Sequence, residues 1–349
     1  MKRVLSVLSV LCLLLAFVPA AVTAETYQDL TYSVSGGKVT ITDCNTSVAG
    51  AVTIPDTIAG YPVTAIATDA FAGCTGLTAI TIGKNVTSIG NAAFSGCTGL
   101  VSISVASGNS VYHSAGNCLI ETSSKTLVVG CKASVIPTDG TVTAIGNMAF
   151  YKCDSLTAIT IPNNVVSIGA SAFEGCTKLA DVTIGSGVKT IGNSAFLNCT
   201  ALAEVAIPDS VTTMGVYVFS GCTKLTSAVI GNQVAAIGNS AFAGCTALTD
   251  VTIGSNVETL YNIIQGKIEA SEFIVKENSP IIDKPLSELH FRARPYSVLL
   301  CDYQRCDLTI IFVCKAVQRV QYALCDIVDV SVASERHDLA LLRLGAFFL

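Results

Sequence analysis

The 349-residue sequence contains no tryptophan, only three histidines and few charged residues. Charged side chains make up 13% of the chain, and the formal net charge is −5. A nucleic-acid surface needs clustered lysines and arginines, so this composition argues against a nucleic-acid partner. HExxH, GxSxG, GxGxxG, CxxC and P-loop motifs are also missing from the sequence. We therefore predict no catalytic residues, no metal ligands and no cofactor, and we expect that the protein is not an enzyme.

The first 24 residues have the pattern of a cleaved export signal. Lys2 and Arg3 precede an apolar run from Val4 to Val18, and the small residues before Glu25 offer a cleavage site. The apolar run is shorter than the ~20 residues that a membrane-spanning helix needs, so a membrane anchor is the weaker alternative. We predict a secreted or cell-surface protein with no transmembrane segment in its mature part.

An Ala-Phe pair, in one case Val-Phe, recurs every 23 residues, for example at Phe150, Phe173 and Phe196. This 23-residue period is broken once, by the 56-residue gap between Phe94 and Phe150. A cysteine follows each phenylalanine at the third position and a leucine at the sixth. A fixed period of this length is the signature of a solenoid, in which each turn stacks on its neighbours. We predict a core ladder of Phe71, Phe94, Phe150, Phe173, Phe196, Phe219 and Phe242, with Cys74, Cys97, Cys153, Cys176, Cys199, Cys222 and Cys245.

One full unit reads AFEGCTKLADVTIGSGVKTIGNS, residues 172–194. The alternation of Val182 and Ile184 predicts a strand with one face in the core. Val188 and Ile191 are predicted to point inward from the return path, and Gly192 to allow a tight bend. Because no single turn can bury these groups alone, stability has to come from stacking.

The pattern I-G-x-x-A-F-x-x-C-x-x-L-x-x-V-x-I-P/G resembles the BspA-type leucine-rich repeat over about residues 30–257. The resemblance implies a β-rich α/β fold, a right-handed leucine-rich repeat superhelix of about eight turns with this period. A parallel sheet would line one face, and the protein would be a bacterial cell-surface or secreted binding or adhesion module. We expect an N-terminal hairpin and capping turn at residues 25–68, and the repeat array at 69–257. A 33-residue insert near 106–140 is predicted to hold a hairpin, CLIE and TLVV around TSSK.

Cysteines in an exported protein raise the alternative of disulfide bonds. The seven ladder cysteines occupy equivalent positions on successive turns, and seven is an odd number, so we favour buried free thiols. Cys118 and Cys131 flank the predicted hairpin, and a bond between them stays open.

Outward positions of the predicted strands form a candidate binding face. Acidic residues recur at one such position and predict a solvated stripe rather than an acid–base pair. The next outward position is rich in threonine. The candidate residues are Thr81, Thr160, Asp181, Thr183, Glu204, Asp250 and Thr252. We expect this broad surface to bind an extracellular protein or glycan, and a structural spacer without a specific ligand is the alternative.

The composition changes after residue 257. Arginine is absent from residues 4–291 but occurs six times after them. The stretch ETLYNIIQGKIEASEFIVKENSPIIDKPLSELHFR (258–292) resembles the entry to the RCK C-terminal domain of TrkA-type potassium-uptake regulators. We therefore predict a partial α+β segment of that type at 258–298. The resemblance implies a ligand-binding regulator of potassium transport as a third functional alternative.

The family pattern is lost after Arg294, which leaves residues 299–349 as an unassigned tail. Regulators of this type work in the cytosol, whereas residues 1–24 predict export. We hypothesise that a foreign coding fragment follows the array and that its reading frame is lost near Arg294. A genuine two-domain protein is the alternative.

Overall fold

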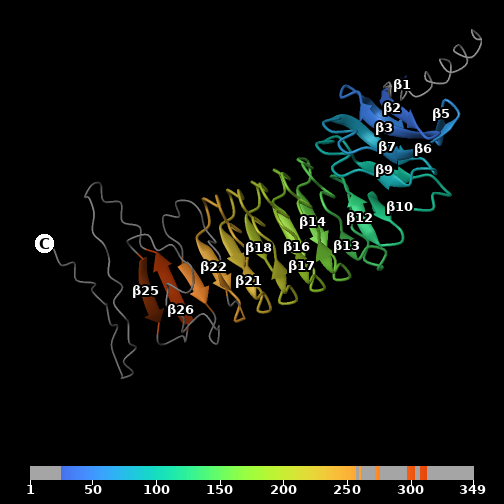
Figure 1. The fold of residues 1–349 in the computed structure, drawn as a ribbon. Helices are drawn as coiled ribbons and strands as arrows, with labels where there is room; N and C mark the ends of the chain where they lie inside the picture. The colour runs from blue at the N-terminus through green and yellow to red at the C-terminus, as the bar shows by residue number, and fades with distance from the viewer. Residues whose placement is uncertain (1–24, 257–258, 261–271, 276–296, 303–306, 313–349) are drawn as a thin grey trace, which may run out of the picture. The chain divides into compact units, whose positions relative to one another are not determined.

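A computed structural model describes residues 25–256, 259–260, 272–275, 297–302 and 307–312 of the chain. The predicted signal segment 1–24 and most residues after 256 lie outside the described residues. The described residues form strands and turns without a helix, so they include none that could cross a membrane. Strands from successive coils lie side by side along the solenoid (Figure 1).

The N-terminal part begins with a sheet built on a hairpin. Ser35 pairs with Lys38 across Gly36 and Gly37, and both glycines have positive φ, as a two-residue type I′ turn requires. The strands are β1 (Glu25–Tyr27), β2 (Leu30–Ser35), β3 (Lys38–Cys44), β5 (Thr57–Ile58), β6 (Tyr61–Ile66) and β8 (Ser88–Ile89). In this sheet β3 pairs in parallel with β6, and β6 with β8, which starts the stacking of the coils, whereas β5 pairs antiparallel with β6.

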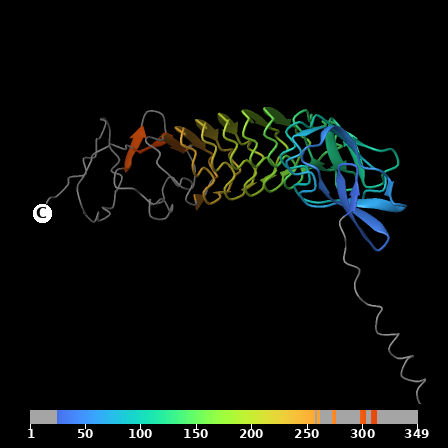
Figure 2. The same cartoon turned by 90° about the horizontal axis from the view of Figure 1, so that it is seen from above.

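One side of the solenoid is lined by parallel strands from successive coils, which form three separately hydrogen-bonded sheets; we call this side the long-strand face. Figure 2 shows these strands edge-on along one side of the coils. Its N-terminal part consists of β4 (Ala49–Thr53), β7 (Gly76–Ile82) and β9 (Ser102–Val105). Its second part consists of β14 (Ala158–Ile161), β16 (Asp181–Ile184), β18 (Glu204–Ala206), β20 (Ser227–Val229), β22 (Asp250–Ile253) and β24 (Glu272–Val275). Two antiparallel strands follow, β26 (Asp307–Phe312) and β25 (Ser297–Asp302).

A second side consists of two-residue parallel strands, the short-strand lane. The insert joins this lane, because β12 (Thr126–Val129) pairs in parallel with β13 (Ala144–Ile145). Antiparallel pairing links β12 to β11 (Cys118–Glu121) and β11 to β10 (Tyr112–Ala115), with Glu121 opposite Thr126. The lane continues through β15 (Ser167–Ile168), β17 (Thr190–Ile191), β19 (Thr213–Met214), β21 (Ala236–Ile237) and β23 (Thr259–Leu260).

The third side of each coil, the corner lane, carries the repeated phenylalanine. Backbone N–H groups of Ser171, Phe173 and Gly175 donate hydrogen bonds of 2.8–2.9 Å to three carbonyl groups of the next coil. Ser171 and Gly175 have φ values of 54° and 73°, so the backbone turns at both ends of this triplet. The same triplet of bonds joins the corners of Phe71, Phe150, Phe196 and Phe219 to the coils that follow them. In these five corners, the corner lane therefore supplies the same coil-to-coil interface.

These observations confirm the predicted leucine-rich repeat solenoid, with about nine coils of about 23 residues rather than eight. The difference arises at the N-terminus. β4 pairs in parallel with β7, and β6 with β8, so the predicted capping turn is itself a coil. The boundaries at 25–68 and 69–257 stay predictions.

Stacked aromatic rings fill the core at the corners. Neighbouring phenylalanine rings lie 4.9–5.5 Å apart between centroids, with interplanar angles of 2–14°. Phe173, Phe196, Phe219 and Phe242 are fully buried. Phe94 and Phe150, on either side of the insert, do not form a stacked pair with each other. The apolar core accordingly divides into two clusters near the insert.

The ladder cysteines are buried free thiols in the structure, and so are Cys118 and Cys131. Each of several thiols donates to the carbonyl of the phenylalanine in the preceding coil, as Cys199 Sγ does to Phe173 at 3.2 Å. The same bond is made by Cys97, Cys176, Cys222 and Cys245. A cysteine at this position therefore fills a small apolar site and gives a second hydrogen bond to a buried carbonyl group that already accepts from a backbone N–H, as Phe173 does from Cys176.

Mild alkali is expected to destabilise the fold through these thiols. Burial raises the pKa of Cys97, Cys153 and Cys199 to about 12, whereas an unperturbed cysteine titrates near ~8.5. Because the folded pKa is the higher one, the stabilisation is complete below about pH 8 and is lost as the pH rises towards about 12. Each thiol that ionises only in the unfolded chain costs up to about 1.4 kcal/mol per pH unit. Urea unfolding between about pH 7 and about pH 9.5 measures this slope.

A matched variant, Cys176→Ala with Cys199→Ala, should show a shallower pH dependence than the parent. Equal slopes in the two proteins would contradict the assignment of the effect to buried thiols.

The structure corrects the reason for the glycine at position 192. Gly192 is not among the residues with positive φ. A Cβ atom there would lie 2.6 Å from the backbone nitrogen of Ala170 and 2.7 Å from the carbonyl carbon of Gly169. Glycine is required because two coils approach closely at this position, and a tight bend is not the reason. Equivalent backbone clashes would arise at Gly90, Gly169, Gly215 and Gly238.

Candidate binding face

The outward residues of the long-strand face fall into two straight columns. Parallel pairing places Ala158 beside Asp181, Glu204 beside Ser227, and Ser227 beside Asp250. Asp181, Glu204 and Asp250 are exposed and occupy this first column. The backbone of Glu272 in β24 pairs with that of Asp250 in the same parallel register. The alternating side-chain direction of a strand keeps all members of a column on one face.

The second column is rich in hydroxyl groups. It contains Thr81, Ser104, Thr160, Thr183, Ala206, Val229 and Thr252, aligned where their strands pair. Thr81 Oγ1 and Ser104 Oγ share a hydrogen bond of 2.9 Å. Thr160 and Thr183 are exposed and line a shallow hollow together with Asn163 and Ser186. All seven candidate residues therefore lie on strands of the long-strand face, in three separate sheets, and the insert separates Thr81 from the other six.

The first column carries negative charge, and within the described residues none of its carboxylates forms a salt bridge. The described part of the chain contains one salt bridge, between Lys84 and Asp56 at 3.1 Å. Hydrogen bonds and charge from Lys84 lower the pKa of Asp56. In contrast, Asp250 accepts a side-chain hydrogen bond from its neighbour Thr249, at 3.0 Å. The three carboxylates of the column remain available for a positively charged partner.

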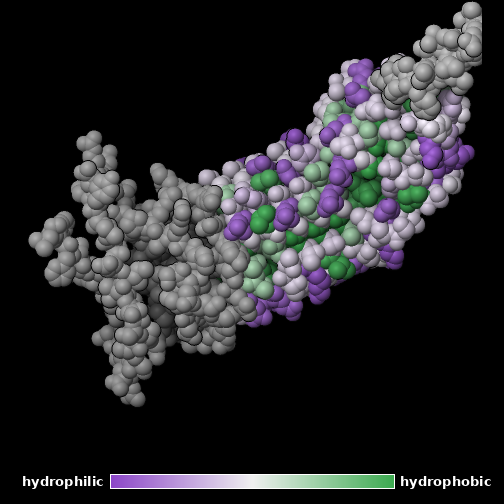
Figure 3. All heavy atoms as spheres, viewed as in Figure 1, coloured by the Kyte–Doolittle hydropathy of each residue, from purple (hydrophilic) through white to green (hydrophobic). Residues whose placement is uncertain are grey.

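The surface drawn in Figure 3 intersperses hydrophilic and hydrophobic residues over the described coils. Val229 in the second column is an exposed apolar residue, with 40% of its surface accessible. Among the described residues, no three His, Cys, Asp or Glu side chains are grouped so that they could hold a metal ion.

The sequence alone did not reveal a cavity in the corner lane. The cavity lies between the coils of Phe94 and Phe150 and has a volume of about 210 Å³. The wide gap between these two phenylalanines in the sequence was the available signal. This gap predicted an inserted hairpin. The sequence pattern does not show that the hairpin joins the short-strand lane, nor that the corner lane is interrupted there.

The chain belongs to the family of the BspA type leucine-rich repeat region. Six copies of this repeat match residues 45–138 and 143–264, which is more than half of the chain. The second match ends seven residues beyond the predicted end of the array at 257. No curated protein matches the chain.

Solved structures of bacterial leucine-rich repeat proteins are similar to this chain. A leucine-rich cell surface protein from Faecalibacterium prausnitzii is 24% identical to this chain. The match covers 69% of this chain and 79% of that protein, with a TM-score of 0.39. A T. pallidum leucine-rich repeat protein is 23% identical, with coverages of 68% and 85% and a TM-score of 0.30. The pneumococcal vaccine antigen PcpA is 15% identical, with coverages of 71% and 89% and a TM-score of 0.44.

The predicted resemblance of residues 258–298 to the RCK C-terminal domain is not supported by these comparisons. Most of this segment lies outside the described residues. Its described strand β24 lies parallel to β22, with Asp250 opposite Glu272 and Ile253 opposite Val275. This register continues the sheet of the repeat array, because Glu272–Val275 repeats the strand position of Asp250–Ile253.

Proposed function

We propose that this protein is an exported bacterial binding module that engages a macromolecule outside the cell through its long-strand face. The observation that carries the proposal is one outward strand position that holds the exposed Asp181, Glu204 and Asp250 on three of the coils, with Thr183 and Thr252 at the next outward position. A repeated array of this kind offers area rather than a pocket, so binding sums many weak contacts. The repeat family to which the chain belongs supports the same role. The role is binding and adhesion rather than catalysis.

The charge of the face favours one kind of partner. Asp181 and Glu204 lie on consecutive coils, and Asp250 lies two coils beyond Glu204. Carboxylates in such a column attract lysine and arginine side chains and accelerate association at low salt. We therefore propose an extracellular protein with a basic surface as the partner, and a neutral glycan as the weaker candidate.

Neutralising the acidic column is expected to weaken binding about tenfold at low salt and to remove most of its salt dependence. The variant combines Asp181→Asn, Glu204→Gln and Asp250→Asn. The experiment first captures partners of the purified protein from panels of matrix proteins, cell-surface proteins and glycans. Association of the strongest binder is then measured at several salt concentrations.

The control variant makes the same change of charge in the corner lane, with Asp69→Asn, Asp154→Asn and Glu174→Gln. It should bind like the parent. Capture of no surface protein, matrix protein or glycan would count against a binding role and in favour of a structural spacer. An equal loss of binding in both variants would place the contact outside the long-strand face.

A further inference from the structure

The insert interrupts the corner lane and leaves one coil edge without its neighbour. In the five corners described above, three backbone N–H groups donate to the following coil. The equivalent groups in the coil of Phe94 belong to Ala92, Phe94 and Gly96, and none of them makes a hydrogen bond within the described residues. The coil-to-coil hydrogen bonds of the corner lane are therefore interrupted at these three donors.

The facing coil keeps part of the matching acceptor set. The carbonyl of Ala149 is occupied, because it accepts a hydrogen bond of 2.8 Å from Gly130 N–H of the insert. Within the described part of the chain, the carbonyl groups of Asn147 and Tyr151, on either side of it, accept no hydrogen bond. Gly130 packs directly on the ring of Phe150, since a Cβ atom there would lie 2.0 Å from that ring. The insert thus packs directly on the ring of Phe150, and its Val129 shares a buried core cluster with Phe94.

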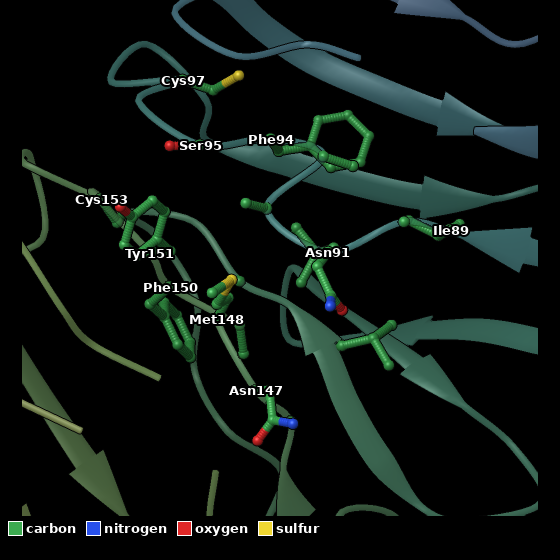
Figure 4. Close-up of a pocket in the computed structure, with 18 of the residues that line it drawn as sticks. Ile89, Asn91, Phe94, Ser95, Cys97, Asn147, Met148, Phe150, Tyr151 and Cys153 are labelled. Atoms are coloured by element: carbon green, nitrogen blue, oxygen red, sulfur yellow. The ribbon is translucent and has the colours of Figure 1, made fainter. Parts of the chain in front are cut away.

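A cavity of about 210 Å³ separates these two coils. Figure 4 shows Phe94 and Phe150 on opposite walls of the cavity, with Met148 beside Phe150. Phe94 is 8% exposed, whereas Phe173 and Phe196 are 0% exposed. The ring of Phe94 therefore has a stacked neighbour, Phe71, on one side only.

We propose that this slot binds an extended peptide segment of another protein, in which a small residue precedes an aromatic residue. In the intact corners, the segment that meets the three donors has this composition, as in Ala195-Phe196, and its ring stacks on the neighbouring phenylalanine at 5.1 Å. A guest segment would take the place of that missing coil. Its three alternate carbonyl groups would accept from Ala92, Phe94 and Gly96, and its aromatic ring would stack on Phe94.

The peptide binds by the same physics as strand addition to an open sheet edge. Main-chain hydrogen bonds supply affinity, and the aromatic pocket supplies selectivity. Charged residues within the central part of the guest are disfavoured, because none of the described residues that line the slot is charged, and Ile89, Leu100 and Val128 present apolar groups to it. This site is separate from the long-strand face and does not depend on the function proposed for it.

The test uses the full chain and a labelled peptide, GNSAFLN, copied from residues 192–198. Fluorescence anisotropy measures binding, and hydrogen exchange locates it. We expect fast exchange at the amides of Ala92, Phe94 and Gly96 in the free protein and protection of these three amides on peptide addition. The amides of Ser171, Phe173 and Gly175, which are already bonded, should not change. A peptide with glycine in place of phenylalanine should bind about three- to tenfold more weakly, because it cannot stack.

A pair of protein variants separates the slot from general packing. Phe94→Leu should weaken binding of the peptide by a similar factor, whereas Phe173→Leu, in a fully stacked coil, should leave it unchanged. Protection of the amides of Ala92, Phe94 and Gly96 in the free protein would show that another part of the chain covers the slot and would overturn the proposal. Binding that protects other residues, or that is equally strong for the glycine peptide, would overturn it as well.

Discussion

Replacing Phe196 by alanine is expected to lower the free energy of unfolding by about 3–5 kcal/mol. Phe196 is fully buried in the middle of the corner ladder. Its ring stacks on Phe173 at 5.1 Å and on Phe219 at 5.4 Å between centroids. The substitution removes both ring contacts and leaves a cavity that two neighbouring coils would have to fill. Urea unfolding followed by circular dichroism measures the change.

Tyr217→Ala is the matched control. Tyr217 is an aromatic residue in the next corner, 46% of its surface is exposed, and its backbone N–H bond to Asn239 does not depend on the side chain. Loss of the Tyr217 side chain should lower the free energy of unfolding by less than about 1 kcal/mol. A Phe196→Ala protein that loses no more stability than the control would mean that the ladder contributes little to stacking of the coils.

The substitution Gly192→Ala is expected to cost about 3 kcal/mol or more, although it adds only one methyl group. The added Cβ would lie 2.6 Å from Ala170 N, so one backbone has to move away from the other. That movement would break the hydrogen bond of 2.8 Å from Gly192 N–H to Ile168 C=O. Thermal and urea unfolding measure the effect, and hydrogen exchange should show loss of protection on both sides of the altered coil.

Gly73→Ala separates this close approach from the conformational effect of replacing glycine. Gly73 has a φ of 73°, and a Cβ atom there would meet nothing within 4 Å. Its substitution should cost about 1–2 kcal/mol, from the left-handed backbone alone. If both substitutions cost the same, steric contact between the coils is not the reason for glycine at position 192.

Much of the coil could be predicted from the sequence because the repeat fixes which side chains point inward. Val188 and Ile191 were expected on the inner side, and both are buried. Phe173 was expected in the core and is fully buried. Because the period is constant, every coil has apolar residues at the same positions, and the burial pattern predicted for one unit applies to all the others.

The end of the array was harder to predict. Tyr261 stands where a glycine was due, and this departure suggested a change of domain at residue 258. The family match nevertheless runs to residue 264, and β24 at Glu272–Val275 keeps the register of the coils. A strand can join a parallel sheet through its backbone, so a loss of side-chain pattern does not by itself end the sheet.

The sequence by itself determined the period, the inward ladder of phenylalanine and cysteine, and the outward columns that include Asp181 and Thr183. Contacts between coils were decided only in the tertiary structure. They explain why Gly192 cannot carry a side chain, why Cys199 donates to Phe173, and why the coil of Phe94 is left with three free donors among the described residues. The physical reason is that a repeat pattern specifies what one coil must bury, whereas the approach of two backbones depends on how neighbouring coils stack.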